Sequence, residues 1–154
     1  MNNNILTNIP LICATCACLI AQGLKPIITK IIHKESHLSY LFTTGGMPSS
    51  HTATTVALST SVAMIHGFGS TLFAVSAALT FIVMHDACNI RNAAGKQAKI
   101  INQWSEILSK IHQDGGFTPE NLKTMLGHTF PQVLVGALLG ILIGVCGTYL
   151  LQGI

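Results

Sequence analysis

The chain has 154 residues, of which 8% are charged and 49% are hydrophobic, and its formal net charge is +3. Soluble domains carry about 25% charged residues, so this composition excludes an ordinary soluble domain and favours an integral membrane protein. The net charge is too small to favour a nucleic-acid-binding protein. The length predicts a single integral membrane domain over residues 1–154.

Four apolar stretches predict an all-α fold, a polytopic membrane helix bundle with about four transmembrane helices. The first stretch, 5–24, is long enough to span a bilayer. The second, 51–66, is short and rich in threonine and serine, which suits an inner helix that faces protein rather than lipid. The third covers 70–84. The fourth, 131–151, begins with a proline, a residue favoured at the start of a helix.

The polar stretch 89–129 has structure of its own. Apolar residues recur there at helical spacing, at Ala94, Ala98, Ile101, Trp104, Leu108 and Ile111. This pattern predicts an amphipathic helix that lies in the membrane interface. Two glycines at 115–116 are predicted to end this helix, and a second, short helix is predicted from Thr118 to Gly127.

The fourth apolar stretch has a glycine at every fourth position, at Gly136, Gly140 and Gly144. Small residues at this spacing form a smooth helix face against which another helix can pack closely. This face is therefore predicted to contact another helix. It also offers a surface through which two copies of the chain would form a homo-oligomer.

All eight lysine and arginine residues fall in two connecting segments, 25–50 and 89–130, which four spans place on the same side of the membrane. Basic residues are enriched in cytoplasmic loops. The sequence therefore predicts that this basic side faces the cytoplasm and that both termini face the opposite side. The predicted location is the plasma (inner) membrane.

The run Gly45–His51 predicts a loop that ends at the N-terminus of a helix. Pro48 prevents a preceding helix from continuing, and Ser49 or Ser50 can cap the helix that begins there. Backbone N–H groups at a helix N-terminus bind anions, and phosphate above all. Ser49 and Ser50 are therefore predicted to bind a substrate phosphate.

Five residues whose side chains could take part in a reaction fall at one membrane face, each at a predicted helix end: Lys25, His51, Asp86, Arg91 and His128. Taken singly, the two cations are explained by contact with lipid head groups, and the others by local hydrogen bonds or charge balance. Together, two cations, two histidines and a helix N-terminus predict a phosphate pocket with a nucleophile and an acid.

The chain resembles the divergent branch of the type 2 phosphatidic acid phosphatase (PAP2) superfamily, which is related to acid phosphatases and vanadium-dependent haloperoxidases. The resemblance covers roughly Gln22 to Gly140. Four motifs carry it: Gln22 with Lys25, Gly-Gly-Met-Pro-Ser-Ser-His, His85-Asp86-Ala87 with Arg91 and Gly95, and Gly127-His128-Thr129 with Val133 and Gly136.

The resemblance implies a membrane-embedded phosphatase that acts on a lipid phosphate or diphosphate and needs no metal or other cofactor. It implies that His128 attacks phosphorus to form a phosphohistidine and that His51 protonates the leaving group. Membrane lipids would be its partners. The phosphoryl oxygens would be held by Lys25, Ser49, Ser50 and Arg91.

The chain departs from the family pattern four residues after His128. Gln132 stands there in place of a carboxylate that would orient the imidazole and stabilise its charge. Asp86 is the candidate for this catalytic role. The departure favours an alternative, a non-catalytic phospholipid-binding or lipid-translocating membrane protein. A structural helix-packing subunit is a weaker alternative, and a haloperoxidase is the least favoured because nothing selects vanadate over phosphate.

Overall fold

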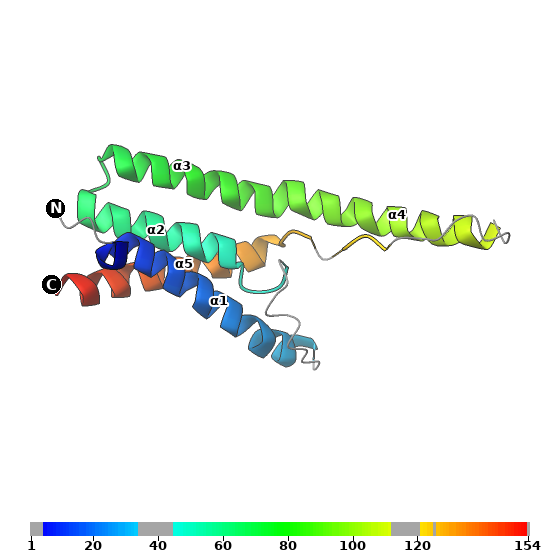
Figure 1. Cartoon of the computed structure of the whole chain (residues 1–154), viewed down its shortest axis with the longest axis horizontal. Coiled ribbons are helices and arrows are strands. Elements are labelled where there is room, and N and C mark those ends of the chain that lie inside the picture. The colour runs from blue at the N-terminus through cyan, green and yellow to red at the C-terminus, as the bar shows by residue number, and fades with distance from the viewer. Residues whose placement is uncertain (1–4, 34–44, 112–120, 125, 154) are drawn as a thin grey trace.

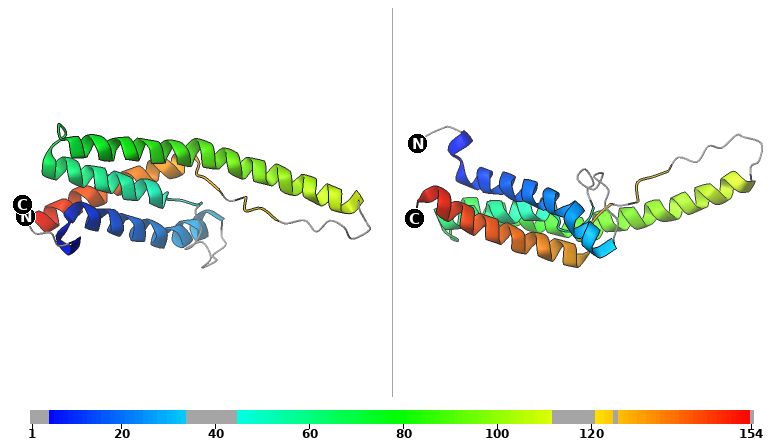
Figure 2. Two further views of the ribbon diagram at one scale, coloured as in Figure 1. Left: turned by 45° about the horizontal axis from the view of Figure 1, so that its top comes forward. Right: turned by 90° about the horizontal axis from the view of Figure 1, so that it is seen from below.

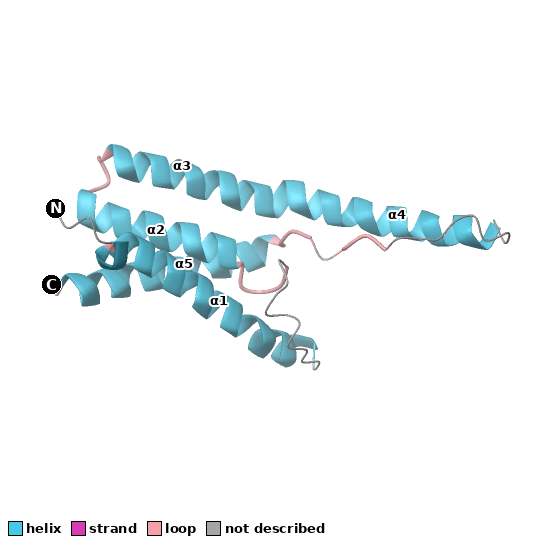
Figure 3. Ribbon diagram, viewed as in Figure 1, coloured by secondary structure: helices cyan, strands magenta, loops and turns pink. Residues whose placement is uncertain are grey.

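The computed structural model describes residues 5–33, 45–111, 121–124 and 126–153, and most of them are helical (Figure 1, Figure 3). Three segments are long and apolar enough to cross a membrane: Ile9–Ile31, Thr71–Ile111 and Phe130–Gln152. The predicted all-α membrane bundle is therefore confirmed. The elements in chain order are η1 (Ile5–Thr7), α1 (Ile9–His33), α2 (Ser50–His66), α3 (Thr71–His85), the π-helical turn η3 (Asp86–Ile90), α4 (Arg91–Ile111) and α5 (Phe130–Gln152).

Helix α2 lies at the centre of the bundle, because α1, α3 and α5 each pack against it (Figure 2). Alanines dominate its core, where Ala53 and Ala57 meet Ala17 and Ala21 of α1. Small side chains let helix backbones approach closely, which gives membrane helices their van der Waals contact. The prediction of an inner helix that faces protein is confirmed by its buried hydroxyl residues, among them Thr52, Ser59 and Ser61.

The glycine face of α5 packs against α2 of the same chain. Carbonyl oxygens of Ser49, Ala53 and Ala57 would lie 2.6, 2.6 and 2.9 Å from Cβ atoms added at Gly136, Gly140 and Gly144. The predicted helix contact is thus observed. The predicted use of this face by a second copy is corrected, because α2 already covers it. Homo-oligomerisation through another surface stays a prediction.

Helix α1 is longer than predicted, because it continues through Pro26 to His33. The proline removes one backbone hydrogen bond, but membrane helices tolerate this loss where neighbouring helices support them. That support comes from one buried stripe on α1, which repeats every fourth residue: Ala17, Ala21, Lys25 and Thr29. Lys25 therefore lies inside the bundle rather than at a helix end.

Helices α3 and α4 form one rod of 41 residues with η3 in its middle, and α4 extends beyond the ends of α2 and α5 (Figure 1, Figure 2). The predicted amphipathic helix is therefore confirmed as α4. It continues the direction of α3 instead of turning across it, because the segment from Met84 to Ile111 contains no proline. Its location in the membrane interface stays a prediction.

A returning segment, residues 121–124 and 126–129, lies beside α4 (Figure 1). The Asn102 side chain holds this returning segment through two hydrogen bonds with the backbone of Leu122, of 2.9 and 3.0 Å. At Gly95 the contact is closer, since an added Cβ would lie 2.7 Å from a backbone oxygen of the segment. Residues 121–124 are not helical, so the predicted short helix is wrong there. Its predicted start, and the glycine stop before it, lie outside the described residues.

The described chain begins and ends at one end of the bundle, the end opposite to α4 (Figure 1). An even number of crossings returns a chain to the side on which it started. The common location of Ile5 and Gly153 therefore fits four crossings, by α1, α2, the α3–α4 rod and α5, of which the 17-residue α2 is the shortest. Which side of the membrane this end faces stays a prediction.

Candidate active site

A small pocket lies where η3, the start of α2 and the segment before α5 meet. A single water needs about 10–15 Å³ of such space, and the pocket offers about 70 Å³. It therefore has room for several waters or for a group of similar size, such as a phosphoryl group. Four of the five residues predicted to converge line it, in a set that comprises His51, Val83, Asp86, Ala87, Arg91 and His128.

The fifth residue, Lys25, lies beside this pocket in the interior of the bundle. Its side chain is 1% exposed, and its Cδ atom would lie 3.9 Å from a Cβ added at Gly46. Gly46 has a φ angle of +93°, a conformation that favours glycine, and it lets the loop before α2 fold over the lysine. The Lys25 charge is close enough to interact with both pocket histidines.

The turn η3 brings Arg91 over Asp86. In a π-turn the backbone N–H of residue i+5 donates to the carbonyl of residue i, and here the Arg91 N–H donates to Asp86 O. Residues five apart therefore lie one above the other, and Arg91 Nε donates to Asp86 Oδ2. In an α-helix the neighbours on one face are three or four residues apart. The wide turn thus sets an ion-paired guanidinium at the edge of the pocket.

The same turn attaches the segment that carries His128. An α-helix would pair the Ala87 carbonyl with the Arg91 N–H, which donates to Asp86 here. The Ala87 carbonyl accepts a hydrogen bond of 2.9 Å from the His128 N–H instead. Asn92 Nδ2 donates to the His128 carbonyl at 3.3 Å. The backbone of His128 is thus held on both sides by the α3–α4 rod.

The two ring nitrogens of His128 have different surroundings. Nδ1 lies 3.2 Å from Gln132 Oε1, which also accepts a hydrogen bond of 3.1 Å from the Thr129 N–H. A backbone N–H can only donate, so this capping contact fixes Oε1 as the atom that faces the ring. Nδ1 must therefore carry the proton, and Nε2 of the neutral ring keeps a lone pair. Among the described residues, Nε2 is buried without a hydrogen-bond partner.

Burial lowers the pKa of His128 below its ordinary value of 6.5. The hydrogen bond that Nδ1 donates to Gln132 raises the pKa, the nearby charges of Lys25 and His51 lower it further, and a hydrogen bond with the backbone of Gly46 raises it. Because burial is the largest effect, the imidazole is neutral at neutral pH. A neutral ring with its proton on Nδ1 presents Nε2 as a nucleophile.

Ser49 and Ser50 do not line this pocket. Ser49 is the N-cap of α2, and its hydroxyl accepts hydrogen bonds from the Thr52 N–H at 3.4 Å and the Thr52 hydroxyl at 3.0 Å. Its own N–H donates to the Gln132 carbonyl at 3.1 Å. Ser50 is 2% exposed. Ser49 therefore joins α2 to the start of α5, and the phosphate contacts of both serines stay predictions.

Asp86 does not occupy the orienting position suggested by the sequence. It pairs with Arg91, whereas Nδ1 of His128 faces Gln132. The suggested replacement of the missing carboxylate by Asp86 is corrected accordingly, because Gln132 orients the ring and Asp86 orients the guanidinium. In the described part of the chain, no three His, Cys, Asp or Glu side chains are grouped so as to hold a metal ion.

Three residues hold the site together in roles that the sequence did not predict: Ala87 and Gly127, which the motifs include, and Asn92, which no motif includes. Ala87 acts through its backbone carbonyl, which no sequence pattern marks. Gly127 has a φ angle of +81°, and an added Cβ would lie 2.3 Å from the Asn92 backbone nitrogen. Only glycine fits this contact, and its position directly before His128 is the one signal that could have shown its importance.

Fold and pocket together define a helical membrane protein with a buried, neutral histidine beside an arginine and a second histidine. A family model described as the divergent PAP2 family matches residues 6–143. The chain is 40% identical over 147 residues to "Uncharacterized membrane protein YuiD" of Bacillus subtilis (strain 168), a match that covers 90% of this chain and 93% of that relative. The chain therefore belongs to the divergent PAP2 family, which confirms the resemblance. No solved structure shows significant similarity to it.

Proposed function

We propose that this protein is a membrane-embedded phosphatase that hydrolyses a lipid phosphate or diphosphate through a phosphohistidine on His128. The observation that carries the proposal is the buried Nε2 of His128, which has no hydrogen-bond partner within the described part of the chain and lies in a pocket also lined by His51 and Arg91. A buried polar atom without a partner costs about 1–3 kcal/mol, and a ligand in the pocket would remove this cost. Membership of the divergent PAP2 family supports the same chemistry.

In the first half of the reaction, the lone pair of Nε2 forms a P–N bond while the bond from phosphorus to the leaving oxygen breaks. The leaving oxygen keeps the electron pair of that bond and takes a proton from His51. A lipid monophosphate thereby releases an alcohol, and a diphosphate attacked at its terminal phosphorus releases a lipid monophosphate. Arg91 and Lys25 stabilise the charge on the phosphoryl oxygens in the transition state.

In the second half, a water molecule attacks phosphorus and transfers a proton to His51, which is now neutral. The P–N bond breaks, its electron pair returns to Nε2, and inorganic phosphate leaves. The enzyme regains a protonated His51 and a neutral His128. Gln132 keeps the proton on Nδ1 in both halves, because its Oε1 accepts a hydrogen bond from that nitrogen.

A second candidate function is favoured by the same glutamine. Replacing the carboxylate beside the histidine of a Ser-His-Asp enzyme lowers its rate about 10⁴-fold. The amide of Gln132 orients the ring but carries no charge to stabilise an imidazolium. The pocket would then serve a non-catalytic phospholipid-binding or lipid-translocating membrane protein.

Release of inorganic phosphate from lipid monophosphates and diphosphates by the purified protein tests the phosphatase function. We expect turnover in the wild type and a loss of about 10⁴-fold or more in His128→Ala, because the nucleophile is removed. The matched control is His66→Ala, which changes an exposed histidine at the other end of α2. This control should keep the wild-type rate.

The intermediate gives a second measurement. With a good leaving group, attack proceeds without the acid, so His51→Ala should accumulate protein phosphorylated on His128, detectable by mass spectrometry. Wild-type protein that binds a lipid phosphate, releases no phosphate and forms no phosphohistidine would establish the binding function instead.

We also propose that the pocket faces the cytoplasm at the plasma (inner) membrane. The pocket is lined by the start of α2, by η3 and by His128, and these segments lie at the end of the bundle away from the described termini (Figure 1). Four of the eight basic residues lie on α4, which extends from that end. Basic segments remain preferentially on the cytoplasmic side. A reporter fused to the C-terminus should therefore be detected outside the cell, and a cytoplasmic signal would contradict this orientation.

A further inference from the structure

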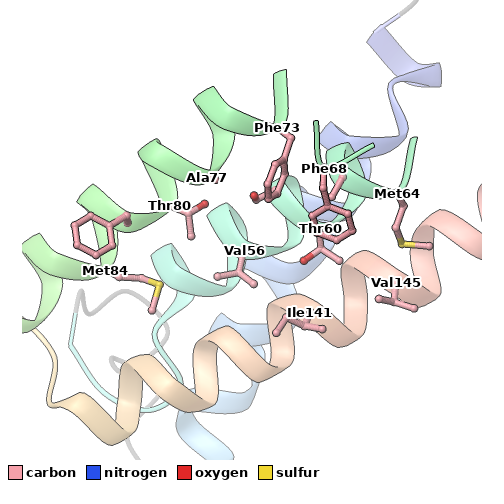
Figure 4. A pocket seen from close by; sticks show the side chains of 13 residues that line it. Val56, Thr60, Met64, Phe68, Phe73, Ala77, Thr80, Met84, Ile141 and Val145 are labelled. Atoms are coloured by element: carbon pink, nitrogen blue, oxygen red, sulfur yellow. The ribbon is translucent and has the colours of Figure 1, made fainter. Parts of the chain in front are cut away.

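An apolar groove of about 600 Å³ lies over α2, between α3 and α5 (Figure 4). Its floor is formed by α2 around Val56 and Thr60. One wall is α3, with Ala77 and Met84, and the other is α5, with Ile141. Both walls belong to segments that are long and apolar enough to cross a membrane. The groove is therefore placed within the hydrocarbon region, where lipid can enter it sideways.

Two hydroxyl groups along the groove, those of Thr80 and Ser59, form hydrogen bonds within the bundle. Thr80 Oγ1 donates to the carbonyls of Thr55 at 2.9 Å and Ser76 at 2.8 Å. The Ser59 hydroxyl accepts from the Ser76 hydroxyl at 3.4 Å. The surface that remains consists largely of hydrocarbon and of methionine thioethers, which adapt to irregular apolar shapes. Such a surface suits a hydrocarbon chain rather than a polar ligand.

The groove extends along α3, from the end nearer the charged pocket (the pocket lined by His51, Asp86, Arg91 and His128) toward the opposite membrane face. At its near end, Met84 follows Val83 directly, and Val83 lines the charged pocket. At its far end, the rings of Phe68 and Phe73 meet edge to face, with centroids 5.1 Å apart. Along α3, the eleven residue steps from Phe73 to Met84 correspond to roughly 16 Å. A chain that starts at the charged pocket would therefore cross about half of a hydrocarbon core of about 30 Å.

We propose that this groove binds the hydrocarbon chain of a lipid phosphate whose phosphate group lies in the pocket of His51, Arg91 and His128. The proposal rests on the proposed function in its choice of ligand and names the substrate as a long-chain lipid phosphate. Lipid tails are as apolar as the groove, so a chain gains no hydrophobic free energy by moving into it from the bilayer. Selection would come from van der Waals fit and from the phosphate contact at one end.

A photoreactive probe tests the groove without relying on turnover. The probe is dodecyl phosphate with a diazirine at the end of its chain, added to the purified full-length protein in lipid nanodiscs. We expect labelling to be concentrated at the far end of the groove, near Met64 and Phe68. We expect excess unlabelled dodecyl phosphate to compete at least fivefold better than dodecanol, which has the same chain without the phosphate.

Two variants that narrow the groove complete the experiment, Ala77→Phe on α3 and Ile141→Phe on α5. Each should reduce labelling at least fivefold, and the second keeps the test valid if the first does not fold. The matched control is Ala78→Phe, which adds the same ring to the neighbouring residue, exposed outside the groove. This control should label like the wild type.

The outcomes separate the groove from the chemistry. Saturable, phosphate-dependent labelling without phosphate release would support the groove and contradict the phosphatase. Phosphate release from dodecyl phosphate, with labelling that both groove variants leave unchanged, would overturn the groove and keep the phosphatase. Labelling that competitors do not reduce would come from probe in the bulk lipid and would overturn the groove. Cross-links between two copies along this face would show that a second chain fills the groove, and would also overturn the proposal.

Discussion

The two flanks of α2 are packed in different ways. On one flank, α5 comes so close that a Cβ added at Gly140 would lie 2.6 Å from the Ala53 carbonyl oxygen. On the other flank, α3 is joined to α2 through hydroxyl groups such as Ser76, and a groove of about 600 Å³ lies beside that contact. Membrane helices pack tightly where both contribute small residues. Where α3 presents the large ring of Phe73, space for lipid remains.

The two flanks contribute different contacts to the site. The tight flank holds Gln132, whose carbonyl accepts from the Ser49 N–H while its side chain sets the proton on His128. Groups that must keep a geometry within fractions of an ångström are best held on rigid helices. The open flank carries the Asp86–Arg91 pair and borders the groove. The ring of His128 is therefore oriented by Gln132 of the tight flank, whereas its backbone is held by Ala87 and Asn92 of the open flank.

The largest expected effect in this comparison comes from removing one cation on each flank. Arg91 belongs to the open flank, and Lys25 lies on α1, which packs against α2 and α5 of the tight flank. Arg91→Ala and Lys25→Met should each lower kcat/KM about 10²–10³-fold, or about 2.7–4 kcal/mol, if each acts as a single donor to the phosphoryl oxygens. Methionine is chosen at Lys25 because it preserves the packing of the buried stem. Steady-state phosphate release measures both effects.

Two exposed lysines provide the controls, Lys30→Met on α1 and Lys110→Ala near the far end of α4. Neither lines the pocket, so neither should change kcat/KM. A wild-type rate in Arg91→Ala would contradict the role given to the open flank, because this flank would then contribute no cation to the reaction.

A smaller effect is expected from testing the tight flank directly. Gly140→Ala should lower the free energy of unfolding by about 1–3 kcal/mol, because its methyl group meets the backbone of α2. The matched change is Gly23→Ala in α1, where an added Cβ has nothing within 4 Å. It should be neutral or stabilising by up to about 1 kcal/mol, through helix propensity. Equal unfolding midpoints of Gly140→Ala and the wild type in detergent would show that the α2–α5 contact can accommodate a methyl group.

The smallest expected effect is a shift in the pH profile. His128 must be neutral to attack, and burial lowers its pKa below 6.5, so the acid limb of the wild-type rate should lie below that pH. A carboxylate beside Nδ1 favours the imidazolium, so Gln132→Glu should raise the pKa of His128 and move the acid limb to higher pH. The same variant should raise the plateau rate, because it stabilises the developing charge.

Stability should follow the same titration. Because the pKa of His128 is lower in the folded chain than in the unfolded chain, the unfolded chain binds more protons between these two values. Folding stability should therefore fall as the pH drops below 6.5.

Gln103→Glu, an exposed change on α4, is the control for the negative charge that Gln132→Glu adds. An acid limb that stays in place in Gln132→Glu would show that His128 is not the group that limits the rate.

Much of this arrangement could be predicted from the sequence, because periodicity and turn residues report it directly. The start of α2 follows from Pro48 and Ser49, and helix ends at one membrane face bring the charged residues together. The continuation of α1 could not be predicted from Pro26 alone, since packing against neighbouring helices decides it. The π-turn was also missed, because it depends on a contact far away in the chain, between Ala87 and His128.

The π-turn also fixes the rotational phase of α4. One extra residue in a helix rotates everything beyond it by about 100°, since an α-helix has 3.6 residues per turn. Asn92 and Asn102 of α4 meet the returning segment in the present phase. Deletion of one residue within 86–90 would restore a regular helix and turn both away from it. The one extra residue of the π-turn therefore sets both the ion pair at the pocket and the rotational phase of α4.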